Sequence, residues 1–332
     1  MKNLKKILSV WRKRNLTIFG KCTIINTLAV SKLVYNAFIL PNPDKEFFKR
    51  VSKIIFNFLW KKRERIKRNT LIGKIEQGGI GIVDIESKFS AAKASWVRRI
   101  LDKDTITHFT LNSLLENSNL SINDIIKTTS CNLNDAKFWE MTNFPQFYVE
   151  VFSMFNKCKK NKQNNRILKE EFLSQFIWHN NLFRYDSKTL CFEQWIKSGI
   201  LYVKDLFDEN GEIHAIDYFW DKLKCKNNIY CEYIILKKTL RPFKSRLDCS
   251  YANYINIQNN DSFLFRNNCF KSIKSLKSDF YYSVLVQSKF QNSIYENKWN
   301  KYFNIEDKSL WKNIYISKIC NMYDKKDCRI QL

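Results

Sequence analysis

The chain has 332 residues, with 57 Lys and Arg against 32 Asp and Glu, and a formal net charge of +25. Because 45% of its residues are hydrophobic and 15% aromatic, it has enough apolar side chains for a packed core, which excludes a wholly disordered protein. Seven Gly and four Pro are too few for a fold built on tight hairpins or Gly-rich phosphate loops. The length suits two domains, and we expect a mainly α protein.

The positive charge is concentrated near the N-terminus. Residues 1–100 hold 23 of the Lys and Arg residues but only 6 of the Asp and Glu residues. A basic domain is typical of a protein that binds a polyanion such as nucleic acid. AT-rich coding is an alternative explanation for the abundant Lys and Asn, but 8 of the 14 Arg residues also lie in this part of the chain. An anionic membrane surface is a third interpretation of a basic, amphipathic N-terminus.

The cysteine pattern does not indicate a metal site. Ten Cys residues are scattered along the chain without a Cys-x-x-Cys pair, and there are only three His residues. Because zinc ligands usually occur in closely spaced pairs, we interpret the cysteines as free thiols of an intracellular protein, in the nucleus or cytoplasm. We expect no cofactor bound by this chain. We also expect no membrane partner, because the apolar stretch over 22–40 has an amphipathic helical period.

The first two predicted helices are basic and amphipathic. The first covers 4–14, and Gly20 is expected to interrupt the helical stretch before the second begins. The second covers 21–39 and ends before Pro41, since a residue preceding proline is disfavoured in a helix.

The third predicted helix has the clearest pattern. Asp44 is a good N-cap, and apolar residues recur with helical period from Phe47 to Leu59. Lysines and Arg50 lie elsewhere around the helix, so it can pack against a core and still present a basic surface. The run KKRERIKR over 61–68 follows directly, and we expect it to be held in place for contact with phosphates.

The glycine cluster Gly78-Gly79-Ile80-Gly81 lacks the third glycine of a dinucleotide-binding fingerprint, and we interpret it as a turn that requires positive φ. A helix over 87–101 follows, with Phe89, Ala92, Trp96 and Ile100 on its inner face. From residue 103 the charge is more balanced and Asn-rich stretches appear. We therefore predict a boundary at 103–110, with a basic domain over 1–105 and an α-rich domain over 106–332.

The second domain has weaker patterns. The sequence predicts a Gly199 C-cap and an Asn210-Gly211 turn. Helices are predicted over 121–127, 135–144, 147–160, 165–178, 214–240 (closing at Pro242) and 278–320.

A series of motifs in the first 100 residues resembles one known family. In chain order these are Trp11, Arg14, Gly20-Lys21, Ser31–Tyr35, Pro41–Pro43, Phe58–Trp60, Gly78-Gly79 and Lys93–Trp96. Together they are similar to the segment just after the catalytic palm of LINE-type (non-LTR) retrotransposon reverse transcriptases. Phe176–Asn180, Trp195–Ile200 and Asp205-Leu206 resemble the same proteins more loosely, so the resemblance spans about residues 4–240.

The resemblance implies a thumb-like helical bundle with a C-terminal extension, which grips RNA, DNA or an RNA–DNA hybrid. Polymerase chemistry needs carboxylates that hold two metal ions. The family places them on a paired-Asp strand, and this sequence has no Asp-Asp pair. We therefore expect the divalent metal to belong to a palm supplied upstream or in trans, and this chain to be inactive alone. The extension is expected to stop before the family's Cys/His cluster, and the endonuclease domain to be missing.

The expected phosphate ligands are basic residues in the region of resemblance. They are Arg12, Arg14, Lys21, Lys61, Lys62, Arg63, Arg65, Lys67 and Arg68. Trp11 and Trp60 fit either base stacking or core packing. The alternative to a nucleic-acid-gripping fragment is a non-catalytic interaction module, or a translated retroelement relic with no activity.

Overall fold

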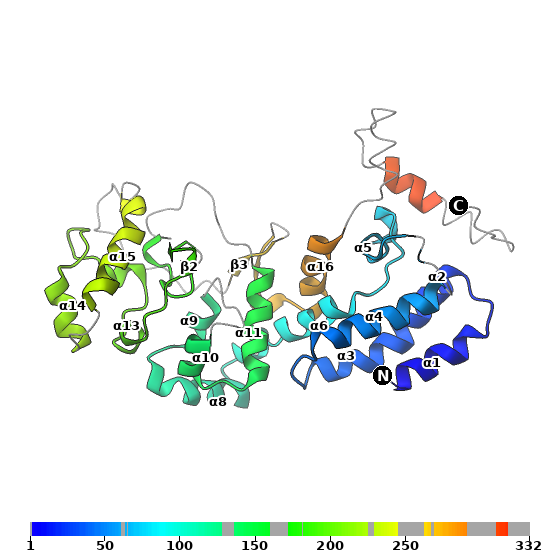
Figure 1. The fold of residues 1–332 in the computed structure, drawn as a ribbon, viewed down its shortest axis with the longest axis horizontal. Coiled ribbons are helices and arrows are strands. Elements are labelled where there is room, and N and C mark those ends of the chain that lie inside the picture. The colour runs from blue at the N-terminus through cyan, green and yellow to red at the C-terminus, as the bar shows by residue number, and fades with distance from the viewer. Residues whose placement is uncertain are drawn as a thin grey trace. The chain divides into compact units, whose positions relative to one another are not determined.

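A computed structural model describes residues 2–60, 64, 66–127, 136–159, 172–180, 182–224, 229–244, 262–266, 269–290 and 310–317. Helices predominate among these residues, which confirms the expected mainly α fold (Figure 1). The chain divides into two compact units. Unit 1 contains residues 1–92 and 282–332, and unit 2 contains residues 93–281.

This division differs from the boundary expected at 103–110. Composition reports the charge of the surface, whereas packing decides which residues belong together. Val97 and Ile100 are fully buried in unit 2, where their helix packs against other helices of that unit. Tyr282 belongs to unit 1, because its hydroxyl accepts a 3.0 Å hydrogen bond from the backbone N–H of Asp84.

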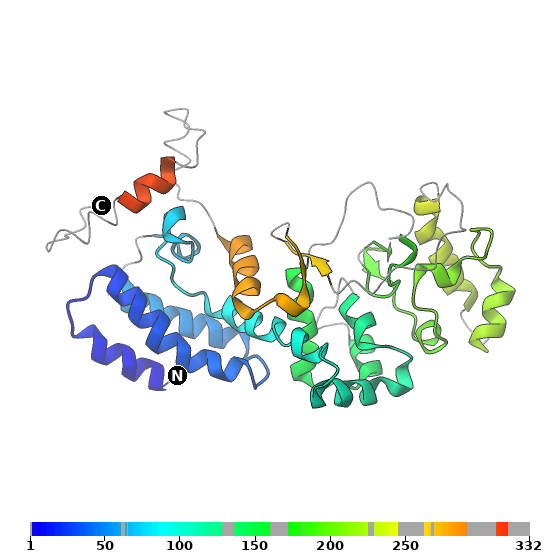
Figure 2. The same cartoon turned by 180° about the vertical axis from the view of Figure 1, so that it is seen from behind.

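Unit 1 begins with two antiparallel helical rods and a third helix packed beside them. One rod is the continuous stretch α2–η1–α3, and the other is α4, which runs antiparallel to it (Figures 1 and 2). The helix α1 packs against η1 and α4. The elements are α1 (Lys2–Arg12), α2 (Ile18–Ile24), the π-helix η1 (Ile25–Val30), α3 (Ser31–Ala37), α4 (Lys45–Trp60), α5 (Arg68–Leu71), η2 (Ile75–Gln77) and the start of α6 (Ile85–Ala94). The end of α16 (Ser278–Lys289) and a helix over 310–317 also belong to this unit.

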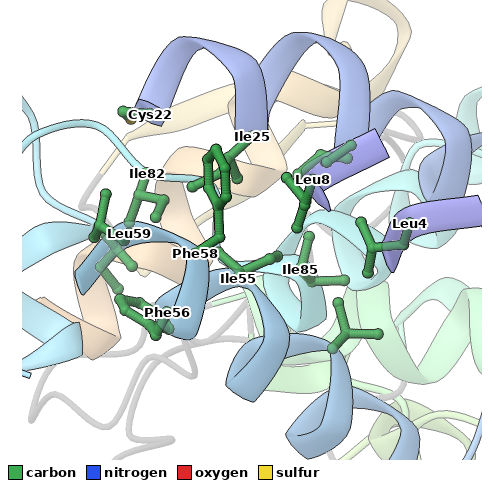
Figure 3. Packing of buried hydrophobic residues seen from close by; sticks show 14 of the residues in the cluster. Leu4, Leu8, Cys22, Ile25, Ile55, Phe56, Phe58, Leu59, Ile82 and Ile85 are labelled. Atoms are coloured by element: carbon green, nitrogen blue, oxygen red, sulfur yellow. The ribbon is translucent and has the colours of Figure 1, made fainter. Parts of the chain in front are cut away.

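The core of unit 1 follows from the amphipathic pattern of these helices. Leu4 and Leu8 of α1 are buried against residues from η1, α4 and α6, as Figure 3 shows. The apolar stripe of α4 supplies Val51, Ile55 and Leu59, each at most 2% exposed. Burial of such side chains is worth about 1.5–3 kcal/mol each before entropic costs, so this stripe anchors the unit.

Two local expectations have opposite outcomes. Asp44 is the N-cap of α4, because its Oδ1 accepts a 2.7 Å hydrogen bond from the backbone N–H of Phe47, as predicted. Gly20 does not interrupt a helix. It lies inside α2, whose N-cap is Thr17, and the Thr17 Oγ1 accepts a hydrogen bond from the Gly20 N–H. The break falls instead in the turn over 13–17, because a capping threonine defines a helix start more strongly than one glycine ends a helix.

The glycine cluster is a turn, as expected. Gly78 and Gly81 have φ of 79° and 67°, the left-handed region that favours glycine. Gly79 is required for another reason, since a Cβ there would lie 2.0 Å from the Gly73 carbonyl oxygen. Asn26 of the π-helix holds the turn, donating to the Gly81 carbonyl at 2.9 Å and accepting from the Val83 N–H at 3.0 Å.

The predicted helix over 87–101 consists of two pieces. The first, α6, ends at Ala94, and a turn at Ser95 and Trp96 precedes α7 (Val97–Ile100). Of the predicted inner residues, Phe89, Ala92 and Ile100 are buried, and Trp96 is half-buried.

The described residues of unit 2 form helices of different lengths and two small antiparallel strand pairs. The helix α7 packs against α8, α11 and η5. Its other elements are α8 (Ile106–Leu115), η3 (Glu116–Ser118), α9 (Ile122–Lys127), α10 (Ala136–Thr142), α11 (Gln146–Cys158), α13 (Glu193–Lys197), η4 (Val203–Leu206), α14 (Ile216–Leu223), α15 (Ile229–Lys244) and η5 (Ile273–Ser275). The antiparallel pairs are β1 (Arg184–Tyr185) with β2 (Lys188–Thr189), and β3 (Ser262–Leu264) with β4 (Phe270–Ser272).

The motifs noted in the second half of the sequence meet in the core of unit 2. The indole N–H of the fully buried Trp178 donates to the Ile200 carbonyl at 2.8 Å, and Phe176 bridges to Tyr202. Gly199, with φ of 78°, follows the end of α13 as expected.

Three helix predictions in this unit need correction. Residues 174–180 form turns and a bridge rather than a helix, and 165–171 lie outside the described residues. The stretch 214–240 contains two helices, because α14 ends at Leu223 and its C-cap residue Lys224 has a left-handed conformation. Pro242 lies inside α15 rather than ending it.

Among the residues that the structure describes, no helix is long and apolar enough to cross a membrane.

Candidate nucleic-acid interface

The nine predicted phosphate ligands separate into three groups. Lys61, Lys62, Arg63 and Arg65 lie outside the described residues. Arg12, Arg14 and Lys67 are exposed, whereas Lys21 and Arg68 are half-buried and hold other parts of unit 1.

Arg12 and Arg14 stand at the C-terminal end of α1. Arg12 is the last residue of the helix and is exposed to solvent. Arg14 folds back, so that its guanidinium carbon lies 4.6 Å from the centre of the Trp11 ring. A guanidinium stacked on an indole keeps its outer N–H groups available while losing freedom of movement, which suits a phosphate ligand.

Lys21 has a structural role. It projects from α2, and its Nζ donates a 2.9 Å hydrogen bond to the carbonyl oxygen of Leu59 near the end of α4. The last carbonyls of a helix lack partners within the helix, and the negative end of the helix dipole favours a cation there. The Gly-Lys pattern therefore marks a helix-capping lysine in this fold.

The Arg68 side chain also contacts residues of its own unit. Its Nε lies 3.0 and 3.2 Å from the two carboxylate oxygens of Glu64, and its guanidinium stacks 4.6 Å from the Phe56 ring centre. The hydrogen bonds from Arg68 lower the pKa of the Glu64 carboxyl. Because Glu64 already occupies one side of the guanidinium, Arg68 is a weaker candidate phosphate ligand than Arg12.

A basic surface runs along α1, and of its residues only Arg12 was among the predicted sites. Five exposed basic side chains lie on α1 or directly after it, and we call this set the α1 stripe: Lys2, Lys5, Lys6, Arg12 and Lys13. Within α1, spacings of three, four and seven residues place Lys2, Lys5, Lys6 and Arg12 on one side of the helix, and Lys13 follows the last of them directly. The sequence signal was present, since residues 1–43 contain no Asp or Glu.

The exposed face of α4 carries less net charge than its sequence suggested. Lys49 forms a 2.9 Å ion pair with Glu46, and Arg50 lies 4.0 Å from Asp44. Such exposed pairs contribute little to stability, but each offsets a positive charge at the surface.

The two candidate stacking residues both pack against the core cluster of unit 1. Trp11 and Trp60 are half-buried there, and the buried Nε1 of Trp60 has no hydrogen-bond partner among the described atoms. This arrangement favours core packing for Trp60, and it makes Trp11 a support for Arg14.

The described residues contain no group of three or more His, Cys, Asp or Glu that could hold a metal ion. In the described part of the chain, Cys22, Cys158 and Cys231 are free thiols. Burial raises the pKa of Cys22 to about 11, and its Sγ donates to the Ile80 carbonyl, so it is a packing residue.

Comparison of the chain with models of known protein families, with curated proteins and with solved structures finds no match.

Proposed function

We propose that this chain is a nucleic-acid-gripping part of a reverse transcriptase of the LINE (non-LTR retrotransposon) type, with the catalytic palm supplied upstream or in trans. The observation that carries the proposal is the α1 stripe, together with Arg14 stacked on Trp11. The ordered series of family-like motifs over residues 11–96 supplies the identity of the enzyme class.

The geometry of α1 suits a phosphate backbone. Eleven residues of α-helix extend about 16 Å, and one strand of a duplex carries a phosphate about every 3.4 Å along the axis. The α1 stripe is therefore long enough to contact several phosphates of one strand. Leu4 and Leu8 hold α1 against the core of unit 1. Because the backbone that carries its lysines is already ordered before binding, the entropic cost of binding is lower.

This mode of binding has no means of reading bases. Contacts from Lys and Arg to phosphates position a duplex but carry no sequence information. We therefore propose that the chain binds nucleic acid without sequence specificity. No catalytic step is assigned to this chain, whose sequence contains no Asp-Asp pair.

The test is salt-dependent binding of a fluorescein-labelled RNA–DNA hybrid, followed by anisotropy. The variant Lys5→Gln/Lys6→Gln/Arg12→Gln removes three charges of the α1 stripe while keeping residues that favour helix. The control Lys188→Gln/Lys238→Gln/Arg241→Gln removes the same charge from exposed positions of unit 2.

We expect the α1 variant to bind more weakly and to lower the slope of log affinity against log salt by about 2–3. The control should keep most of the wild-type slope. Equal loss in both variants would show that binding depends on net charge alone and would contradict the proposed interface. If the wild-type chain does not bind at physiological salt, the relic or interaction module becomes the better account.

A further inference from the structure

Unit 2 contains a second basic site, separate from the α1 stripe. A cavity of about 930 Å³ is bounded by α7, the turn that follows it, α8, the start of α9 and η5. Such a volume lies within the range of small-ligand sites.

Four basic side chains from three segments line this cavity. Arg98 and Arg99 belong to α7, Lys103 to the next turn and Lys274 to η5, which packs against α7. Arg99 is partly fixed, because its guanidinium carbon lies 4.9 Å from the Trp96 ring centre. The fold thus gathers charges that are more than 170 positions apart in the sequence.

Two carboxylates also border the cavity, so its lining has an excess of two positive charges. Asp102 and Asp104 are both exposed, and the Asp102 Oδ1 accepts a 3.3 Å hydrogen bond from the Asp104 N–H. The Asp102 carboxylate therefore stabilises the turn to which it belongs.

His108 and Asn112 form another part of the polar wall. The Nδ1 of His108 lies 2.8 Å from the Ile100 carbonyl oxygen, so this nitrogen carries the proton. Its Nε2 then accepts from the Asn112 amide nitrogen at 2.8 Å. The amide orientation of Asn112 follows, and its oxygen and second amide hydrogen remain for a ligand.

We propose that this cavity binds a nucleotide, with its phosphate held by Arg98, Arg99, Lys103 and Lys274. Guanidinium groups bind phosphate oxygens through paired, charge-assisted hydrogen bonds, which are stronger than neutral ones. Asn112 offers a donor and an acceptor to the edge of a base. The ligand chemistry is that of a free mononucleotide or of the 5′-terminal nucleotide of an RNA strand. This site needs no residue of unit 1 and stands apart from the proposed function.

The test is calorimetric titration of the full chain with adenosine monophosphate. Adenosine, which differs from it only in lacking the phosphate, is the comparison ligand. The variant Arg98→Gln/Lys274→Gln is compared with Lys238→Gln/Arg241→Gln, which removes the same charge from exposed positions of α15. We expect wild type and control to bind the nucleotide, with adenosine at least about tenfold weaker and the cavity variant weakened by about tenfold or more.

Equal binding of adenosine and the nucleotide, an unaffected cavity variant, or no nucleotide binding by the wild type would overturn the proposal. Thermal melting verifies that the variants fold, and Lys103→Gln alone tests the same site with a smaller change.

Competition by a 5′-phosphorylated RNA, but not by its 5′-hydroxyl form, would identify a strand end as the ligand. Competition by neither identifies a free mononucleotide. The α1 variant should retain nucleotide binding, which separates this site from the duplex grip.

Discussion

The ammonium group of Lys21 on α2 caps α4 through a 2.9 Å hydrogen bond to the carbonyl oxygen of Leu59. Its neighbour Cys22 donates to the Ile80 carbonyl, so consecutive residues tie one helix to another helix and to the glycine turn. A motif residue with the expected charge thus supports the core rather than facing a ligand.

Lys21→Met should destabilise unit 1 without a special effect on nucleic-acid binding. The loss of a charged hydrogen bond at a helix C-terminus is expected to lower the free energy of unfolding by about 1–2 kcal/mol. Urea denaturation measures this change. Lys32→Met, at an exposed position of α3, is the control. The two variants should bind an RNA–DNA hybrid with similar affinity, because each loses one charge; a selective loss in Lys21→Met would assign Lys21 to the interface.

Arg68→Gln should also affect stability more than binding. The substitution removes the stacking on Phe56 and the ion pair with Glu64, together worth about 1 kcal/mol. Arg12→Gln, which replaces an exposed residue of the α1 stripe, should leave unfolding nearly unchanged but weaken hybrid binding. Parallel denaturation and anisotropy measurements on both variants check this contrast. The reverse pattern would restore Arg68 as a phosphate ligand.

Lys93 should give unit 2 a characteristic dependence of stability on pH. Its fully buried Nζ lies 3.7 Å from the Glu150 carboxylate and 3.7 Å from the Phe147 ring centre. Burial lowers its pKa to about 8, although Glu150 opposes the shift. Between this value and the ordinary 10.5 the unfolded chain binds the proton more tightly, so this group makes folding more favourable as pH rises.

The measurement is the difference in unfolding free energy between wild type and Lys93→Met. We expect this difference to grow by on the order of 2 kcal/mol from pH 8 to pH 10.5. Taking a difference is essential because Cys22 and Tyr282, whose pKa values are raised by burial to about 11 and about 12, oppose folding at high pH in both proteins. A difference that stays constant with pH would mean that Lys93 has an ordinary pKa.

Two glycine substitutions should have opposite effects. Gly79→Ala places a Cβ 2.0 Å from the Gly73 carbonyl oxygen, and we expect a loss of more than about 2 kcal/mol because backbone must move. Gly20→Ala lies in α2 with its nearest contact at 3.4 Å, and it should stabilise the protein by about 0.5–1 kcal/mol. Thermal melts of both variants provide the test. Similar destabilisation by both would contradict the helical placement of Gly20.

Much of unit 1 could be predicted from local patterns. The helical period from Phe47 to Leu59 identified α4 and its buried face, and Asp44 identified its start, because both signals act over a few residues. The glycine turn was also predictable from composition. In unit 2, the end of α14 and the non-helical segment over 174–180 were missed, because a left-handed residue and a tertiary bridge override helical propensity.

For the candidate interface, sequence by itself determined that the N-terminal region is strongly basic and that α1 is amphipathic. Only the tertiary structure decided how each charge is used. Lys21 and Arg68 bind partners within unit 1, whereas Arg12 remains on an exposed helical face. Likewise, Arg98 and Lys274 meet only because α7 packs against η5. Charge is a property of single residues, but its availability depends on distances that arise only when distant segments pack together.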